Sequence, residues 1–282
     1  MSNYLHTHYN LDDPKLVSIL DETPYWSAPP GTAILDRMPF RKNMNVLDIG
    51  FGTGFPLIEA AMRLGNTCSV YGIDPWSAGC DRVKQKLAIC GISNVKIIEG
   101  TAERMSFENN FFDIIVSNNG MNNIDDLPNA LKECNRVAKT GGRFIFTFNT
   151  EKTFIEFYSV YREVLMENGL QEYDRKISEH IYHKRKPIPE MQNLLSQSGF
   201  KLLSSDEDAY YYSFTDGTAM LNHFLIRLAF LDTWKNILPE AKQDGVFKQI
   251  ELKLNNQAAL TGGFSMKVPF IMMDCEKIKA IA

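Results

Sequence analysis

Short apolar runs alternate with segments of helical spacing in the first half of the chain. The apolar runs predict strands at Val46–Ile49, Ser69–Ile73, Val95–Glu99, Phe112–Ser117 and Arg143–Phe148. The segments between them predict helices at 55–64, 77–90 and 126–138, the last of which is expected to stop at the Gly141-Gly142 pair. Apolar runs of this length between helices are typical of parallel strands buried on both faces. The pattern therefore predicts a doubly wound α/β sheet.

The pattern changes after residue 150, where aromatic and charged segments interrupt the alternation. The predicted order is a helix at 151–168, a charged segment at 170–186, a helix from Pro187 to Gly199, a strand at 200–214, helices across 217–259 and a last strand at 264–274. The stretches 151–186 and 215–260 interrupt the sheet rather than follow it, so they fit a helical cap better than an independent domain. The expected division is N-terminal lid helices at 1–44, a ligand-binding core at 45–150, cap insertions at 151–186 and 215–260, a core helix and strand at 187–214, and the final strand at 261–282.

Composition narrows the class of protein. Of the 282 residues, 44% are hydrophobic and 23% are charged, which excludes a disordered chain, a coiled coil or a collagen. The net charge of −4 argues against a positive field over the whole surface for nucleic acid. Five cysteines without a CxxC pair favour reduced thiols in a cytoplasmic protein over a disulfide framework or a zinc cluster. The polar N-terminus lacks the apolar region of a signal peptide, and the apolar stretch 220–231 is too short to cross a membrane.

Three glycines follow the first predicted strand directly, in the sequence VLDIGFGTG at 46–54. Gly50, Gly52 and Gly54 allow a sharp turn and let a ligand approach the main chain. Their spacing is GxGxG, not the GxGxxG of nicotinamide-binding proteins, which disfavours a nicotinamide oxidoreductase. Asp48 precedes the first glycine by two residues and would repel a pyrophosphate. We therefore expect a cationic or amino-bearing ligand at this turn.

Three more strand ends carry polar residues. Asp74 ends the second strand, twenty residues after Gly54, where a carboxylate can accept hydrogen bonds from both hydroxyls of a ribose. Trp76 could cover an adenine face or simply pack the sheet edge. The loop at 100–103 follows the third strand, and SNNGMNN at 117–123 ends the fourth. Because ligands of open α/β sheets bind outside the carboxyl ends of the strands, we expect these segments to meet in one crevice.

These motifs, in this order, resemble the class I S-adenosylmethionine-dependent methyltransferases. VLDIGFGTG matches the first motif of the family, Asp74 its ribose-binding acid, and FFDIIVSNNG its fourth-strand motif. The resemblance implies a mostly parallel, Rossmann-like sheet of seven strands with an antiparallel last strand, S-adenosylmethionine as cofactor, S-adenosylhomocysteine as product, and no metal. The family often has Asp where Thr101 stands, so Thr101 or the backbone of Ala102 must contact the adenine amino group here. The residues expected to bind the cofactor are Asp48, Gly50, Gly52, Gly54, Asp74, Pro75, Trp76, Thr101, Ala102, Glu103 and Asn118.

The resemblance implies methyl transfer by in-line displacement, in which the protein mainly aligns donor and acceptor and excludes water. An enclosed pocket under the insertions suits a small or medium organic acceptor. One alternative is an RNA or protein methyltransferase that uses the basic stretch 174–186, although the acidic balance and the lack of an NPPY-type motif argue against it. Another alternative is a non-catalytic protein that binds an adenosyl ligand.

Residues that contact the acceptor are less sharply marked. Tyr25 and Trp26 precede a Pro-Pro-Gly break and are candidates for a lid, although they could staple the N-terminal helix to the sheet. Asn119 and Asn122 are expected at the mouth of the crevice, where capping the next helix is an equal interpretation. His223 is the candidate catalytic base, with a satisfied buried histidine as the alternative. The aromatic residues of the insertions are expected to form the core of the cap or to line an apolar pocket; they are Phe154, Phe157, Tyr158, Tyr161, Phe224, Phe230 and Trp234.

Overall fold

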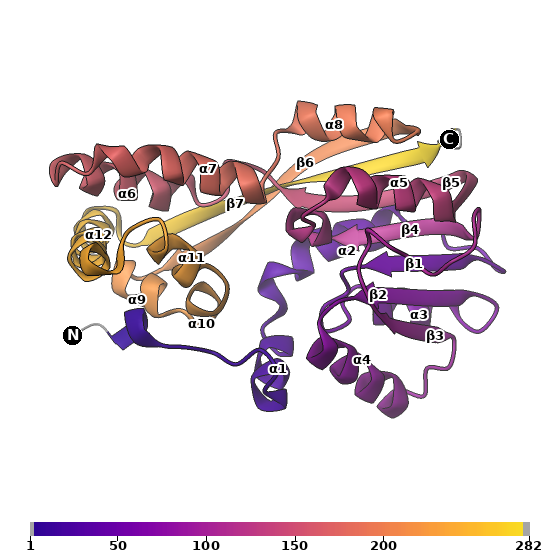
Figure 1. Cartoon of the computed structure of the whole chain (residues 1–282). Helices are drawn as coiled ribbons and strands as arrows, with labels where there is room; N and C mark the ends of the chain where they lie inside the picture. Colours follow the sequence, from indigo (N-terminus) through magenta and orange to yellow (C-terminus); the bar gives the residue numbers. More distant parts are fainter. Residues whose placement is uncertain (1–2, 279–282) are drawn as a thin grey trace. The chain divides into compact units, whose positions relative to one another are not determined.

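The computed structural model describes residues 3–278, which separate into two compact units (Figure 1). The sheet unit comprises residues 11–149, 186–208 and 270–278. The helical unit comprises residues 3–10, 150–185 and 209–269. Because the boundaries at 208/209 and 269/270 fall inside the last two strands, each of these strands contributes to both units.

A seven-stranded sheet forms the centre of the sheet unit, in the order β3-β2-β1-β4-β5-β7-β6. Its strands are β1 (Asn45–Ile49), β2 (Ser69–Asp74), β3 (Val95–Glu99), β4 (Phe112–Asn118), β5 (Ala138–Asn149), β6 (Phe200–Phe214) and β7 (Phe264–Lys277). The first five strands pair in parallel, and β7 runs antiparallel to β5 from Arg143↔Glu276 to Asn149↔Phe270. This arrangement confirms the predicted doubly wound, mostly parallel sheet in which the last strand of the chain is antiparallel.

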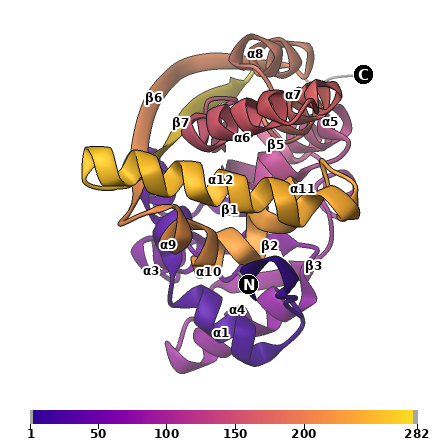
Figure 2. The ribbon, with the colours of Figure 1, turned by 90° about the vertical axis from the view of Figure 1, so that its left-hand side faces the viewer.

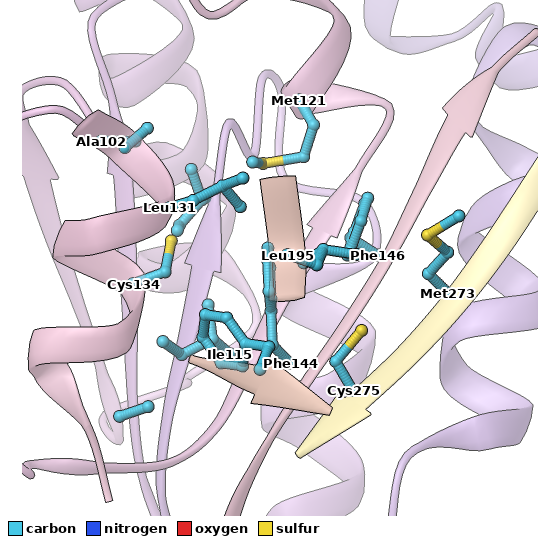
Figure 3. Close-up of a cluster of buried hydrophobic side chains, with 14 of the residues drawn as sticks. Ala102, Ile115, Met121, Leu131, Cys134, Phe144, Phe146, Leu195, Met273 and Cys275 are labelled. Carbon is cyan, nitrogen blue, oxygen red and sulfur yellow. The ribbon is translucent and has the colours of Figure 1, made fainter. Parts of the chain in front are cut away.

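Side chains alternate along the central strands and so build two hydrophobic layers. Ile115, Phe144 and Phe146 point to one face, where they pack with Leu131 and Leu195 from two covering helices (Figure 3). These helices are α5 (Leu127–Val137) and α8 (Ile188–Gln197). The opposite face packs against α2 (Ala28–Arg37), α3 (Leu57–Leu64) and α4 (Ser77–Ile89). The sheet is therefore covered on both faces, as strands that read as continuous apolar runs require.

The Gly141-Gly142 pair does not end a helix, which corrects the sequence prediction. Helix α5 ends at Val137 and β5 begins at the next residue. The register with β4 shifts between Phe112↔Ala138 and Ile114↔Arg143, so the glycines belong to a bulge inside the strand. Gly141 has a φ of +75°, and a Cβ on Gly142 would lie 2.8 Å from the carbonyl oxygen of Lys139. Glycine is required by the bulge, not by a helix terminus.

Helices make up most of the helical unit. They are η1 (Asn3–His6), α6 (Ile155–Glu167), η4 (Gln171–Tyr173), α7 (Asp174–Lys184), α9 (Gly217–Asn222), α10 (Phe224–Ile226), the π-helix η5 (Arg227–Leu231), α11 (Asp232–Lys235) and α12 (Glu240–Thr261). The long α12 packs against α6 and α9 (Figure 2). The helical region predicted across 217–259 is interrupted at His223, whose ψ of 134° is extended.

The aromatic residues of α6 and α11 form the core of the helical unit. Phe157 stacks on Trp234 with ring centroids 3.9 Å apart, and the Trp234 Nε1–H donates to the Tyr158 hydroxyl at 3.0 Å. All three side chains, together with Phe154 and Tyr161, are fully buried. These five residues are therefore core residues, one of the two interpretations that the sequence allowed.

Within residues 3–278, no helix combines the length and the apolar character that a membrane crossing needs. The remaining helical segments of the sheet unit are α1 (Pro14–Asp21) and η2 (Pro24–Trp26), which precede α2.

A buried carboxylate in β7 forms hydrogen bonds and ion pairs with neighbouring elements. Asp274 in β7 is 2% exposed and accepts hydrogen bonds from the Arg143 guanidinium of β5, one of them at 2.7 Å. Arg37 of α2 lies 3.8 Å from the same carboxylate and also donates to Asp206 of β6 at 2.7 Å. The network therefore joins a helix to three strands.

We predict that Asp274→Ala lowers the free energy of unfolding by about 2–3 kcal/mol, because it leaves two arginines without their buried partner. Asp206→Ala is the matched control: its side chain is 52% exposed, so the loss should stay below about 1 kcal/mol. Urea denaturation of both variants measures the difference. Equal losses would show that the buried pair contributes no more than the exposed one.

Candidate functional site

The glycine turn after β1 is open to a ligand at its middle glycine. Gly50, Gly52 and Gly54 all have positive φ, at +74°, +55° and +108°. A Cβ on Gly54 would lie 2.8 Å from Ile58 Cδ1, so this glycine lets α3 pack closely. A Cβ on Gly52 would meet no atom within 4 Å. Gly52 is therefore the glycine whose missing side chain leaves space beside the backbone.

Asp74 holds this turn in place from the end of β2. Its Oδ2 accepts from the Gly52 N–H and its Oδ1 from the Trp76 N–H, both at 2.8 Å. Burial raises the pKa of Asp74, and the two backbone donors offset this effect only in part. Each carboxylate oxygen can accept a second hydrogen bond. Asp74 can therefore position the turn and still accept the two hydroxyls of a ribose.

Asp48 is a buried carboxylate without a hydrogen-bond donor. It is 1% exposed, and neither of its oxygens has a partner among the described residues. Burial, reinforced by the negative charge of Asp74, raises the pKa of Asp48 to about 8. A buried carboxylate is normally paired, because desolvation without compensation is costly. The missing donor fits a cationic or amino-bearing ligand and does not fit a pyrophosphate.

Trp76 and Gly79 bring the start of α4 against the glycine turn. A Cβ on Gly79 would lie 2.8 Å from the Gly52 carbonyl oxygen and 2.6 Å from the Trp76 ring. The Trp76 indole N–H donates to the Leu11 carbonyl at 3.1 Å, which fixes the orientation of the ring. Gly79 was not among the predicted site residues, since nothing in a glycine inside a helical segment reveals a close approach to another loop. The adenine contact of Trp76 remains a prediction.

A second set of missed residues braces the turn from α4. The Lys86 ammonium donates to the Thr53 carbonyl at 2.8 Å and also pairs with Asp21 of α1. Arg82 donates to the same carboxylate at 2.9 Å. Burial opposes ionisation of Asp21, but the hydrogen bonds from Lys86 and Arg82 outweigh it and hold its pKa below the ordinary value. The i, i+4 spacing of the two cations was the available signal, although it equally describes a solvated helix face.

The loop after β3 lies at the same edge of the sheet. The Gly100 N–H donates to the Asp74 carbonyl at 3.1 Å, which places the loop beside the acid that we predict to bind a ribose. Thr101 is exposed, whereas Ala102 is buried in the hydrophobic layer below. The Glu103 carbonyl accepts from the Asn129 side chain at 2.9 Å. In this loop the Thr101 side chain is therefore exposed, whereas that of Ala102 is part of the hydrophobic core.

The three asparagines at the end of β4 have different environments. Asn118 donates to the Ser27 carbonyl at 2.9 Å and so ties β4 to the start of α2. Asn122 is paired with the backbone N–H and carbonyl of Asn149 at 3.0 and 3.3 Å. Asn119 has a left-handed φ of +57°, and both atoms of its buried side-chain amide lack a partner in the described structure. Asn119 is thus the asparagine available to a ligand, while Asn122 is committed to β5.

The segment that carries Tyr25 and Trp26 leads into α2, which packs against Phe55 and Asn118. Both residues belong to η2, directly before α2, and Tyr25 is 50% exposed. A Cβ on Gly31 would lie 2.4 Å from the Phe55 ring and 2.8 Å from Asn118 Nδ2. This closeness positions η2 near the end of β4. A lid role for the two aromatic residues remains a prediction.

His223 belongs to the helical unit, whereas the glycine turn belongs to the sheet unit. Its ring makes T-shaped contacts with Tyr212 and Phe214, with centroids 5.7 and 5.5 Å away. Burial, followed by the charge of Arg227, lowers the pKa of His223. Its Nδ1 is buried without a partner among the described residues, so the interpretation as a satisfied buried histidine does not hold. The assignment as catalytic base stays a prediction.

Sequence comparison agrees with the geometry of this site. Residues 47–146 match the family described as a methyltransferase domain. Over 136 residues the chain is 35% identical to a demethylmenaquinone methyltransferase of Staphylococcus aureus, a match that covers 47% of this chain and 56% of that protein. The chain therefore spans about half the length of the curated relatives it matches.

Solved structures share the fold. The YcgJ protein from Bacillus subtilis gives a TM-score of 0.56 at 18% identity, over 89% of this chain and 98% of its own. A SAM-dependent methyltransferase from Aquifex aeolicus gives 0.51 at 18% identity, over 68% and 91%. Residues 47–146 therefore match the methyltransferase domain family, and the chain shares the fold of these solved structures.

Proposed function

We propose that this protein transfers the methyl group of S-adenosylmethionine to a small or medium organic acceptor. The observation that carries the proposal is the unpaired carboxylate of Asp48 beside the open backbone of Gly52. The Asp48 carboxylate has no cationic partner among residues 3–278. The methionine end of the cofactor can supply one, because it carries an ammonium group and a sulfonium. Asp74 supplies the acceptors for the ribose hydroxyls. When bound, the cofactor supplies a methyl group on an already activated leaving group.

The chain's own residues then need mainly to position the two reactants. Asp74 fixes the glycine turn through Gly52, and Lys86 supports the same turn through Thr53. Asn119, with its unpartnered amide, is the residue of the sheet unit that we assign to the acceptor. Alignment and exclusion of water account for most of the rate in such a displacement. The roles of Tyr25 and Trp26 as a lid, and of His223 as a base, belong to this proposal.

A small acceptor is favoured over a polymer by the state of the basic stretch 174–186. Arg175 pairs with Glu179, and Lys176 lies over the Tyr173 ring. Arg185 is 5% exposed, so it offers little charge to a surface ligand. The curated relatives are named for demethylmenaquinone, which is also a small-molecule acceptor. A helical cap formed by 151–186 and 215–260 remains part of the proposal.

Titration calorimetry with S-adenosylmethionine, S-adenosylhomocysteine and NADH tests the cofactor assignment. We expect binding of both adenosyl ligands and none of NADH. Asp74→Ala should weaken S-adenosylhomocysteine binding by about 1–3 kcal/mol, because it removes a charged acceptor and releases the glycine turn. A wild-type protein that binds neither adenosyl ligand would refute the proposal. Binding without methyl transfer to any acceptor in a tritiated-methyl screen would instead support a non-catalytic protein.

We expect Asp48→Asn to have opposite effects on the stability of the protein and on its affinity for S-adenosylhomocysteine. Because the folded protein disfavours ionised Asp48, wild-type stability should fall relative to the variant as the pH rises from near 4 to about 8. Above pH 8 the cofactor-free variant should be more stable by a few kcal/mol, while its affinity for S-adenosylhomocysteine should drop about tenfold or more.

Thermal unfolding across this pH range, together with calorimetry, measures both effects. Asp113→Asn is the matched control, since the Asp113 carboxylate already accepts from Lys139 and from the Asn45 N–H. This control should not gain stability at high pH and should bind the ligand as the wild type does. A destabilised Asp48→Asn would contradict the description of Asp48 as an unpaired charge.

Gly52→Val should abolish cofactor binding while leaving the protein folded. The side chain would enter the open space beside the turn, at a cost of about 1–2 kcal/mol for the left-handed backbone. Gly91→Val is the control, because Gly91 has a φ of +63° and equally open surroundings at the end of α4. Both variants should lose similar stability in urea denaturation, but only Gly52→Val should lose S-adenosylhomocysteine binding. Retained binding in Gly52→Val would place the ligand elsewhere.

A further inference from the structure

Some basic side chains of the helical unit have a buried nitrogen atom that lacks a partner among the described residues. Three of its buried side-chain nitrogens have no hydrogen-bond partner among the described residues: Arg185 Nη1, His223 Nδ1 and Arg227 Nε. The corresponding atoms of the sheet unit are the oxygens of Asp48 and the amide of Asn119. The helical unit therefore lacks acceptors or negative charge for its basic nitrogens. The sheet unit instead lacks hydrogen-bond donors for the Asp48 carboxylate.

Two of these basic residues form one cluster. The Arg227 backbone N–H donates to the His223 carbonyl at 3.0 Å, so the two residues are one helical turn apart on the same face. The charge of Arg227 also contributes to lowering the pKa of His223, after burial. Their two unpartnered nitrogens consequently belong to one locality.

Aromatic rings surround this cluster. Tyr212 and Phe214 present rings to His223 at 5.7 and 5.5 Å. The Arg227 guanidinium carbon lies 5.7 Å from the Tyr9 ring centroid, and Tyr9 in turn makes a T-shaped contact with Phe224. Rings of this kind are suited to an aromatic partner.

Arg227 has no counter-ion in the described structure. Its guanidinium makes one long polar contact, 3.4 Å from Nη1 to the Thr7 hydroxyl, and it forms no ion pair with a carboxylate of residues 3–278. A guanidinium that is partly removed from water without a counter-ion is unfavourable. An anionic ligand group would supply both the charge and the acceptors.

The backbone is also irregular at this position. Arg227 begins the π-helix η5, and His223 separates α9 from α10 with an extended backbone. π-Helical turns are rare and occur frequently at functional sites, since they are less favourable than α-helix. The break and the π-turn together place His223 and Arg227 at a discontinuity in the helical region.

We propose that His223 and Arg227 form a binding site for the carboxylate of an aromatic ligand. Arg227 Nε–H donates to one carboxylate oxygen, and His223 Nδ1–H, in that tautomer, donates to the other. Tyr9, Tyr212 and Phe214 contact the ring. The identification of this ligand as the methyl acceptor rests on the proposed function, whereas the binding site itself does not.

The probe is 2-naphthoate, compared with the uncharged 2-naphthamide of the same shape, titrated into the whole protein without S-adenosylmethionine. We expect 2-naphthoate to bind at least about tenfold more tightly than 2-naphthamide, since a charged hydrogen bond is lost with the amide. In Arg227→Gln this preference should disappear. Arg175→Gln is the matched control, because Arg175 is an exposed arginine of the same unit, and it should keep the preference.

Two further readouts keep the proposal falsifiable. S-adenosylhomocysteine binding should be unchanged in Arg227→Gln, which shows that the variant folds. In wild-type protein labelled with ¹⁵N-histidine, 2-naphthoate should shift the His223 signals, identified through His223→Gln, and leave those of exposed His6 unchanged. Equal binding of the two probes, an Arg227→Gln variant that keeps the preference, or unshifted His223 signals would each overturn the site. A wild-type protein that does not bind S-adenosylhomocysteine would refute the proposed function, but it would not contradict the carboxylate site.

Discussion

The hydrogen bond from the Gly52 N–H to the Asp74 carboxylate is the contact on which the candidate site depends. It joins the turn after β1 to the end of β2, so that the open face of the turn lies beside the Asp74 carboxylate. The same carboxylate also holds the Trp76 N–H, which begins α4. Lys86 then returns from α4 to the turn at Thr53. Each element of the site is therefore fixed by another, and little of it relies on loop flexibility.

This arrangement has an energetic cost that falls on Asp48. A carboxylate at 1% exposure with no donor is an unfavourable group in the cofactor-free protein. The cost is reduced by protonation, which is why the pKa of Asp48 rises to about 8. A binding site that is complementary to a charged ligand carries such unsatisfied groups until the ligand arrives. Asp48 and Asn119 both have buried polar side-chain atoms without a partner among the described residues.

The two units differ in the kind of group they leave unsatisfied. Carboxylate oxygens lack donors in the sheet unit, and basic nitrogens lack acceptors in the helical unit. A cationic ligand group would satisfy the first kind of atom, and an anionic ligand group would satisfy the second. The helical unit lies outside the segment 47–146 that matches the methyltransferase family, so the match to that family says nothing about the ligand of this unit.

The order of strands and helices, the glycine turn and the two acids followed from the sequence, because each depends on residues close together in the chain. Val95–Glu99 and Phe200–Phe214 have the bounds that their apolar patterns predicted. Tertiary structure decided the rest. Whether Gly141-Gly142 ends a helix or forms a bulge depends on the register with β4, and whether Asn119 or Asn122 is free depends on Asn149 in a neighbouring strand. Likewise, residues far away in the sequence decide that Asp48 is unpaired and that Asp21 is paired. Contacts between such remote residues leave no local pattern in the sequence.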